Sequence, residues 1–369
     1  MDFSLDAVLP HPDAAASGAI GHDAADRLIL DESAPARAAL TAADVVVIGD
    51  EFGALALAAA SAAAGGAVRV HQDALTAERA LQANAERFAL TARVAAHPLD
   101  ADLVHAARVV LLRLPRSLDA LRDVAGLIAA HAAPDVVVYA GGRIKHMTTA
   151  MNDVLGAFFT RVDVTHARQK SRVLIARGPH DGRDPVPAAS VADGVAVRAF
   201  GGVFAGAGLD IGTRVLLEHL PALGGRERVV DLACGNGVVA ATLALRHPLL
   251  HVYACDVSAA AVASARATAG ANGVGDRVEV VQDDALSTLA DGSVDVIALN
   301  PPFHRGAAID ERLAPHLFAD AARVLRGGGE LWTVWNSALQ YRSALERIVG
   351  PTRQVVRTPK FTVTASVAR

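Results

Sequence analysis

Short runs of β-branched residues alternate with longer Ala- and Leu-rich stretches along most of the chain, and this alternation is what most constrains its fold. Short apolar runs of this kind are typical of buried parallel strands, and the stretches between them are long enough for helices. The pattern therefore predicts an α/β protein with mostly parallel sheets. In the second half we expect strands at 228–232, 251–255, 278–281, 294–299, 330–334, 354–358 and 361–367, and helices at 238–246, 259–271 and 313–325.

A break in the pattern divides the chain into two domains. Gly, Pro and Asp cluster in GPHDGRDPVPAAS at 178–190, where the apolar periodicity stops. The 369 residues are enough for about two domains of ordinary size. We therefore expect an N-terminal domain at 1–180, a linker at 181–190 and a C-terminal domain at 191–369 with a mostly parallel, seven-stranded sheet.

The first half of the chain repeats the rhythm of the second. VVVIGDEFG at 45–53 can be laid on VVDLACGNG at 229–237, so that Gly53 matches Gly237. We therefore expect two tandem Rossmann-like domains, the first of them degenerate. At three positions the first half has lost a polar residue or glycine of the second: Val47 stands for Asp231, Glu51 for Gly235 and Leu114 for Asn300.

The composition argues against several classes of protein. Half of the residues are apolar (52%), yet no run reaches the roughly 18 uncharged apolar residues that a membrane helix needs. MDFSLDAVLPHPD at the start carries acids where a secretory signal has basic residues. Cys234 and Cys255 are too few for a disulfide framework, and no cluster has metal-ligand spacing. We expect a cytoplasmic protein with neither a membrane nor a metal partner.

Polar residues follow three successive strands of the C-terminal domain. After Asp231 ends the first strand, Gly235 and Gly237 allow a tight turn and the close approach of a ligand to the next helix. Asp256 ends the second strand, where a carboxylate can bind two ribose hydroxyls. The segment 283–285, Asp-Asp-Ala, follows the third strand, where an adenine can be bound. These residues predict a nucleotide-type ligand but fit both a dinucleotide and S-adenosylmethionine.

Asn300-Pro301-Pro302-Phe303 follows the fourth strand and decides between these ligands. An exocyclic amino group on a purine is a poor nucleophile because its lone pair is delocalised. The Asn300 side-chain oxygen and the Pro301 carbonyl can accept its two N–H bonds, and Phe303 can stack on the base. Hydride transfer has no use for this arrangement, so the predicted cofactor is S-adenosylmethionine.

Five segments, taken in order, resemble a known family: GLDIGT at 208–213, VVDLACGNGVVAATLAL at 229–245, VYACDVSAAAVASARATAGANGV at 252–274, DVIALNPPFH at 295–304 and GGELWTVWN at 328–336. The chain resembles the class I S-adenosylmethionine-dependent rRNA (guanine-N2-)methyltransferases, and their large-subunit (23S) branch more than their small-subunit (16S) branch. Members of that family look like two tandem methyltransferase-like domains, the first degenerate.

The resemblance implies a role for each matched position. The implied cofactor residues are Asp231, Ala233, Gly235, Asn236, Gly237, Asp256, Val257, Asp284 and Ala285, and the implied catalytic residues at the target guanine are Asn300, Pro301, Pro302 and Phe303. The chain departs from the family at one place. The family usually has Phe-Ser-Arg before its Leu-Asp-x-Gly string, whereas this chain reads Phe-Ala-Gly at 204–206, so Arg198 or Arg214 is a candidate replacement for that arginine.

One segment has a local excess of positive charge that would attract a phosphate backbone, and a solvated helix face and strand edge with ordinary arginine usage is the alternative explanation. Residues 143–183 carry 8 basic and 3 acidic side chains, in a chain whose net charge is −4. We expect methyl transfer to N2 of a guanine, in 23S rRNA or a ribosomal subunit precursor, by a monomer whose first domain binds RNA and serves as a scaffold. The alternatives are a 16S rRNA guanine, an adenine N6 or protein glutamine amide, a non-catalytic RNA-binding assembly factor, and an NAD-dependent dehydrogenase.

Overall fold

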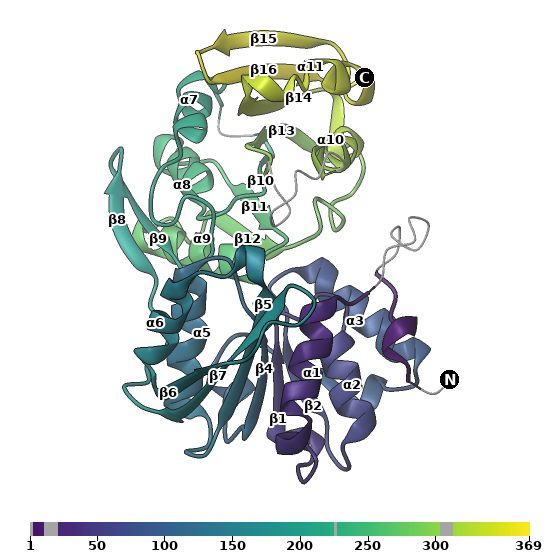
Figure 1. Ribbon diagram of the computed structural model, residues 1–369. Coiled ribbons are helices and arrows are strands. Elements are labelled where there is room, and N and C mark those ends of the chain that lie inside the picture. The colour runs from purple at the N-terminus through teal and green to yellow at the C-terminus, as the bar shows by residue number, and fades with distance from the viewer. Residues whose placement is uncertain (1–2, 11–20, 225–226, 303–312) are drawn as a thin grey trace. The chain divides into compact units, whose positions relative to one another are not determined.

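The chain folds into two compact units, Met1–Val186 and Pro187–Arg369, each built on its own seven-stranded sheet (Figure 1). The structure is a computed structural model that describes residues 3–10, 21–224, 227–302 and 313–369. Within these ranges no helix is long and apolar enough to cross a membrane, and no group of three or more His, Cys, Asp or Glu residues is placed to hold a metal ion.

The strands of the first unit lie in the order β3-β2-β1-β4-β5-β7-β6. The five strands from β3 to β5 run parallel, and β7 is antiparallel to both of its neighbours. The strands are β1 (Val45–Ile48), β2 (Val68–His71), β3 (Val94–Ala96), β4 (Val109–Arg113), β5 (Val137–Arg143), β6 (Phe159–Val164) and β7 (Ser171–Pro179). The helices are α1 (Ala24–Arg37), α2 (Ala54–Ala62), α3 (Leu75–Arg87), α4 (Ala101–Val104), α5 (Leu118–His131) and α6 (Thr149–Gly156), with short 3-10 turns η1 (Leu5–Ala7), η3 (Ala42–Asp44), η4 (Thr91–Arg93) and η5 (Ile144–His146).

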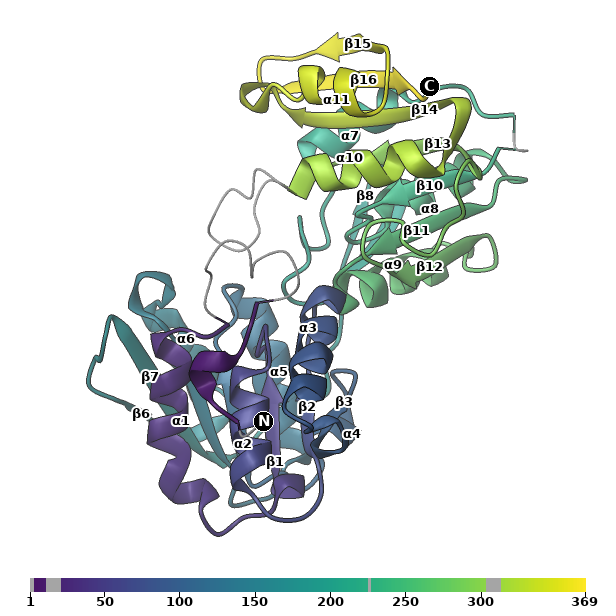
Figure 2. The same cartoon turned by 90° about the vertical axis from the view of Figure 1, so that its right-hand side faces the viewer.

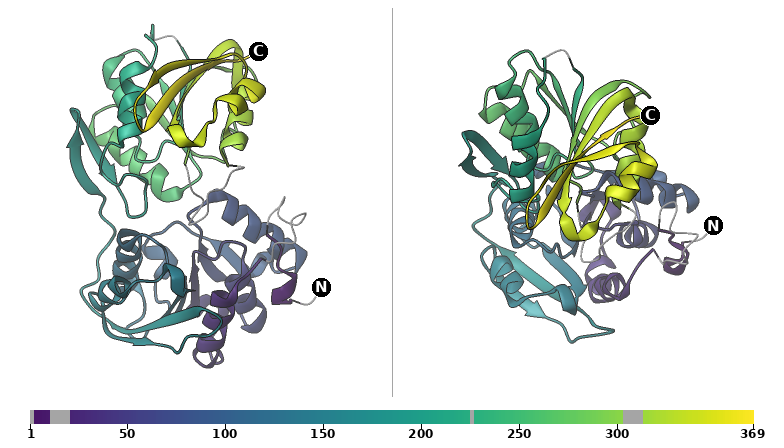
Figure 3. Two further views of the ribbon diagram at one scale, coloured as in Figure 1. Left: turned by 45° about the horizontal axis from the view of Figure 1, so that its top comes forward. Right: turned by 90° about the horizontal axis from the view of Figure 1, so that it is seen from above.

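The second unit has a hairpin followed by a sheet with the order β12-β11-β10-β13-β14-β16-β15. The hairpin consists of β8 (Ala188–Ala192) and β9 (Val195–Ala199). The sheet strands are β10 (Val229–Leu232), β11 (Val252–Asp256), β12 (Val278–Gln282), β13 (Val294–Leu299), β14 (Leu325–Asn336), β15 (Thr352–Arg357) and β16 (Phe361–Val367). The helices are α7 (Ile211–His219), α8 (Val238–Arg246), α9 (Ala259–Ala271), α10 (Leu313–Val324) and α11 (Arg342–Ile348), with the 3-10 turn η6 (Ser337–Leu339). Figure 3 shows β14, β16 and β15 in yellow at one edge of this sheet.

Numbered in chain order within each seven-stranded sheet, the strands of both sheets lie in the order 3-2-1-4-5-7-6. The predicted fold class, two tandem α/β units with mostly parallel sheets, is therefore confirmed. The predicted helices over 238–246 and 259–271 have the bounds of α8 and α9. Most other predicted boundaries differ by one or two residues, and the largest difference is at β14, which runs over Leu325–Asn336 where a strand over 330–334 is predicted. Leu325 already pairs with Val294, and the glycines at 327–329 follow within the same strand, at an irregularity in its register.

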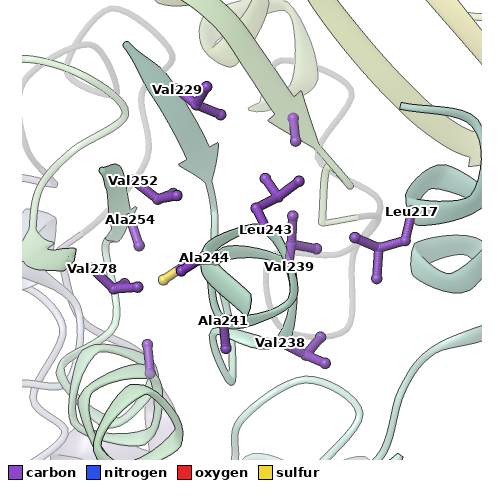
Figure 4. Close-up of a cluster of buried hydrophobic side chains, with 14 of the residues drawn as sticks. Leu217, Val229, Val238, Val239, Ala241, Leu243, Ala244, Val252, Ala254 and Val278 are labelled. Carbon is purple, nitrogen blue, oxygen red and sulfur yellow. The ribbon is translucent and has the colours of Figure 1, made fainter. Parts of the chain in front are cut away.

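Helices cover both faces of each sheet. In the second unit α7, α8 and α9 pack on one face, and α10 and α11 pack on the other, where Figure 2 shows α10 running along the sheet. In the first unit α1, α2 and α3 share one core, and α4, α5 and α6 share the other. Figure 4 shows Val229 of β10, Val252 of β11 and the α8 residues Val239 and Leu243 within one cluster of buried side chains. Burial on both faces explains why the central strands are almost wholly apolar.

The segment between the units is more ordered than its composition predicts. The Arg183 amide donates to the Gly126 carbonyl on α5 at 3.0 Å, and Asp184 pairs with His131 at 2.6 Å. Residues 188–190 belong to β8, which pairs with β9. Of the predicted linker at 181–190, residues 183–184 and 188–190 make these contacts, and 181–182 and 185–187 lie outside them. Polar residues that a composition argument assigns to a linker are here fixed by hydrogen bonds to a neighbouring helix.

Candidate active site

The loop between β10 and α8 takes left-handed backbone conformations at alternate residues. Ala233, Gly235 and Gly237 have φ angles of 56°, 55° and 74°. A Cβ at Gly237 would lie 2.7 Å from the Cα of Ala265 on α9, so the close approach of the two helices requires glycine there. A Cβ at Gly235 would meet nothing within 4 Å. The loop thus places the first N–H groups of α8 at the carboxyl edge of the sheet, where they favour anionic or polar ligand groups.

Asp231 lies beneath this loop as a buried carboxylate. Its side chain is 3% exposed, and its Oδ2 accepts a hydrogen bond from the Ala240 amide of α8 at 3.0 Å. Burial raises the pKa of Asp231 to about 7, and the negative charge of Asp256 adds to this shift. The carboxylate fixes the start of α8 against the end of β10.

Asp256 ends β11 and is oriented from two sides. Its Oδ2 accepts from the Gly235 amide and its Oδ1 from the Ser258 amide, both at 3.0 Å. The carboxylate therefore joins the glycine loop to the start of α9. The next residue, Val257, has its carbonyl bound by the Gln282 side-chain amide at 3.0 Å.

The turn after β12 is anchored by Asp283. This side chain is 1% exposed and accepts hydrogen bonds from the Thr288 amide and hydroxyl at 3.0 and 2.8 Å. The carboxylate of Asp284 lies 3.5 Å from the His316 imidazole on α10. Ala285 has a φ of 55°, and its carbonyl accepts from the Cys255 thiol at 3.2 Å. The peptide at 284–285 is thus held beside the end of β11, and Asp283 is its structural anchor.

The Asn236 side chain binds a segment that lies outside its own loop. Its Nδ2 donates to the carbonyls of Gly206 and Gly208, each at 2.8 Å, and its Oδ1 accepts from the Val238 amide at 3.2 Å. These bonds use both donors of the amide and its oxygen. The Asn236 side chain therefore holds the segment 206–208 against the glycine loop, a role that its position in the loop did not reveal.

We expect Asn236→Ala to weaken S-adenosylmethionine binding about tenfold, because the loss of these bonds releases the 206–208 segment. Asn272→Ala is the matched control. The Asn272 side chain makes a similar set of bonds to backbone groups of Ala196 and Thr268, away from the loop. Calorimetric titration with the cofactor and urea unfolding measure the two effects. Equal loss of cofactor affinity in both variants would show that the change reflects general destabilisation.

Asn300 follows β13 and contacts the first turn of α7. Its Nδ2 donates to Asp210 Oδ2 at 3.2 Å and to Thr213 Oγ1 at 2.9 Å. Pro301 is buried and Pro302 is exposed, whereas the predicted stacking residue Phe303 lies outside the described residues. Because β10 pairs with both β11 and β13, the ends carrying Asp231, Asp256 and Asn300 are adjacent. The structure thus brings the predicted loop, ribose and amine residues to one edge of the sheet.

Comparisons with known proteins agree with this geometry. The methyltransferase small domain family matches residues 194–365, and the RLMG N-terminal domain family matches residues 11–180. The ribosomal RNA large subunit methyltransferase G of Streptomyces avermitilis is 36% identical over 365 residues, which cover 94% of this chain and 93% of that protein. The ribosomal RNA large subunit methyltransferase G of Pseudomonas syringae pv. syringae is also 36% identical, over 92% of this chain and 91% of that protein. The chain belongs to the ribosomal RNA large subunit methyltransferase G family.

A solved structure shows the same fold over the whole chain. The T. thermophilus 16S rRNA N2-methyltransferase (RsmC), solved with AdoMet and guanosine, has a TM-score of 0.74 and covers 95% of this chain and 94% of its own. It is 21% identical, so this likeness is one of fold. The chain is an S-adenosylmethionine-dependent methyltransferase, which confirms the predicted enzyme class and cofactor. The left-handed glycine loop, the open space at Gly235 and the oriented Asp256 carboxylate fit this cofactor.

In the first unit, the loop after β1 keeps the backbone conformation of the glycine loop but differs from it in residue types. Gly49, Glu51 and Gly53 have φ angles of 78°, 51° and 93° and stand 184 positions before Ala233, Gly235 and Gly237. Asp50 is buried there, and its two carboxylate oxygens accept from the Leu55 and Ala56 amides at 2.8 and 2.7 Å. The first turn of α2 is therefore occupied by the chain's own carboxylate. Burial raises the pKa of Asp50 to about 8.

Strand register corrects one residue of the predicted duplication. Ile48 pairs with Leu112 in the first sheet, and Leu232 pairs with Leu299 in the second. The next residues, Arg113 and Asn300, are therefore equivalent, and the prediction that Leu114 stands for Asn300 is wrong by one position. The sequence comparison aligned the ends of two unequal apolar runs, whereas the pairing of neighbouring strands fixes the true correspondence.

Sequence reasoning missed the partners of Asn300. Asp210 and Thr213 lie in the GLDIGT segment, which was recognised as a motif but given no role. Their signal was an N-cap acid followed three residues later by a hydroxyl. The candidate replacements for the absent arginine are engaged elsewhere. Arg214 pairs with Asp193 at 2.9 Å in a cavity of about 270 Å³, and the Arg198 guanidinium donates to the Val197 carbonyl.

Proposed function

We propose that this enzyme methylates the exocyclic N2 of a guanine in 23S rRNA. The observation that carries the proposal is the fixed amide of Asn300, whose nitrogen donates to Asp210 and Thr213. The amide oxygen is then the atom left to accept a hydrogen bond from a substrate amino group. The relatives named as large-subunit rRNA methyltransferases support 23S rRNA as the substrate. We also propose a monomer that acts in the cytoplasm.

Catalysis in this proposal is mainly positioning. Asn300 Oδ1 and the Pro301 carbonyl accept the two N–H bonds of the target amine, so that its lone pair is held toward the cofactor. The proline rings restrict the backbone and fix the direction of that carbonyl. Phe303, carried over from the family resemblance, stacks on the base. The amine proton leaves to water after transfer, so no strong base is needed.

The same proposal assigns the carboxylates and loops to the cofactor. S-adenosylmethionine supplies the activated methyl group when it is bound. Asp256 would accept hydrogen bonds from the ribose hydroxyls, and the peptides of Ala233, Gly235 and Gly237 would line the methionine and ribose. Asp231 supports this loop from below. Asp284, Ala285 and Val257 would contact the adenine, at the ends of β11 and β12.

Transfer of a labelled methyl group tests the proposal. The enzyme is incubated with tritiated S-adenosylmethionine and deproteinised 16S or 23S rRNA from a strain lacking the gene, and the labelled nucleoside is identified. We expect N2-methylguanosine from 23S rRNA alone. Label in 16S rRNA would move the substrate to the small subunit, and label in an adenine would overturn the guanine assignment. If neither rRNA nor the ribosomal subunits accept label, an RNA-binding assembly factor or a protein amide substrate becomes the better reading.

The first unit offers a surface for the RNA backbone. Arg143, Lys145 and His146 follow one another at the end of β5, and the Arg116 guanidinium lies 3.3 Å from the His146 imidazole. Partial desolvation and then the positive charges of Arg116, Lys145 and Arg143 lower the pKa of His146. Among the described residues, no carboxylate forms an ion pair with these cations. We therefore propose that this cluster binds RNA phosphates, with the first unit also serving as a scaffold.

We expect Arg143→Ala and Lys145→Ala each to weaken RNA binding. Each should also reduce the slope of log affinity against log salt concentration by the amount that corresponds to about one phosphate contact. Arg161→Ala is the matched control, since Arg161 lies in the same basic segment but pairs with Asp163 at 2.9 Å. Filter binding of an rRNA fragment across a salt series gives both quantities. A slope that stays the same in the cluster variants, or falls equally in the control, would place the RNA elsewhere.

A further inference from the structure

We propose that Asp210 and Thr213 are positioning residues, which hold the Asn300 amide with its nitrogen toward α7 and its oxygen toward the substrate. The inference rests on the proposed function, in which Asn300 accepts the target amine. It adds two residues, 87 and 90 positions away in the sequence, through which the acceptor is oriented.

The contact geometry gives the amide a preferred orientation. Asp210 is the N-cap of α7, and its Oδ2 accepts from both the Thr213 amide at 3.1 Å and Asn300 Nδ2 at 3.2 Å. Thr213 is 6% exposed, and its Oγ1 accepts from the same Nδ2 at 2.9 Å. Rotating the amide by half a turn would place its oxygen against the Asp210 carboxylate. Electrostatic repulsion and the loss of two donated bonds oppose that rotation.

The first unit has the corresponding contact between a helix and a strand end, but with different side chains. Asp23, Asp26 and Arg113 stand 187 positions before Asp210, Thr213 and Asn300. Asp23 is the N-cap of α1, and Arg113 forms ion pairs with both Asp23 and Asp26. The contact between the first helix turn and the end of the fourth strand is kept, but arginine has donors only and cannot accept an amine. The second unit has asparagine and threonine where the first has Arg113 and Asp26, so it keeps a side chain that can accept a hydrogen bond as well as the packing contact.

Four substitutions separate orientation from helix capping. Asp210→Ser keeps a good N-cap for the Thr213 amide but is too short to reach Asn300, and Thr213→Val removes the hydroxyl at nearly constant shape. Asp210→Asn and Thr213→Ser keep the accepting oxygens. We expect single-turnover methyl transfer to slow about tenfold in Asp210→Ser and in Thr213→Val. It should stay within about threefold of wild type in the two conservative variants, with cofactor Kd and rRNA KM unchanged throughout.

Two further measurements decide how these residues act. In an Asn300→Ala background Thr213→Val should cause no additional loss, because its effect passes through the amide. In ¹⁵N spectra the Asn300 side-chain N–H signals, identified by their absence in Asn300→Ala, should exchange with water faster in Asp210→Ser and Thr213→Val than in wild type. This readout does not depend on activity. Full activity and unchanged exchange in both variants would overturn the positioning role alone, whereas full activity of Asn300→Ala would overturn the proposed function.

Discussion

Asn300→Ala is expected to slow methyl transfer by about 10²–10³-fold while leaving S-adenosylmethionine binding within about twofold of wild type. Removing one preorganised hydrogen-bonding group from an active site typically costs a factor of this size. The loss should be in kcat, because the amide acts on the reactive orientation of the amine and does not carry most of the contact area with the RNA. Asn300 makes its described side-chain bonds to α7, and none of them reaches the glycine loop.

Single-turnover rates on 23S rRNA and calorimetric titration with the cofactor measure the two halves of this result. Asn272→Ala provides the identical chemical change at the end of α9, where the side chain bonds to backbone groups. Its methyl transfer rate should match wild type. Retention of turnover in Asn300→Ala, or loss of cofactor binding without loss of folding, would contradict the division of labour between the loop and the end of β13.

Asp231→Asn is expected to gain stability over wild type as the pH rises. The free energy of unfolding of the variant minus that of wild type should be about 2–4 kcal/mol larger at pH 7 and above than at pH 4. The pKa of Asp231 is raised from 3.8 to about 7 by burial, so the folded protein holds a proton that the unfolded chain releases. The contribution of Asp231 to the free energy of unfolding of wild type therefore falls as the pH rises from about 4 to about 7 and is level above that. Asparagine does not ionise and escapes this loss.

The hydrogen bond to α8 should survive this substitution, since the asparagine oxygen can replace Asp231 Oδ2 as the acceptor for the Ala240 amide. Urea unfolding of wild type and Asp231→Asn between pH 4 and pH 8.5 gives the pH-dependent difference. Asp119→Asn is the control for the chemical change, because Asp119 is 77% exposed and pairs with Arg122 at the surface. A difference between Asp231→Asn and wild type that does not grow with pH would mean that Asp231 is ionised in the fold.

Local patterns predicted much of the fold and of the site. The apolar runs located every strand of the second sheet, and the position of Gly237 marked the start of α8 because that backbone conformation disfavours other residues. Asp256 and Asn300 were predicted as site residues because parallel strands present their carboxyl ends at one edge, and the structure places these strand ends next to each other. The Asn-Pro-Pro-Phe string at 300–303 predicted the chemistry that separated a methyltransferase from a dehydrogenase.

The sequence by itself determined the α/β class, the duplication and the residues at the strand ends, since each depends on neighbours within a few positions. Only the tertiary structure decided that Arg113 is the counterpart of Asn300, that Asp50 occupies the first turn of α2, and that Asn236 holds the 206–208 segment. It alone brought Asp210 and Thr213 to Asn300. Strand register and side-chain hydrogen bonds depend on which distant segments pack together, and that information is absent from local periodicity.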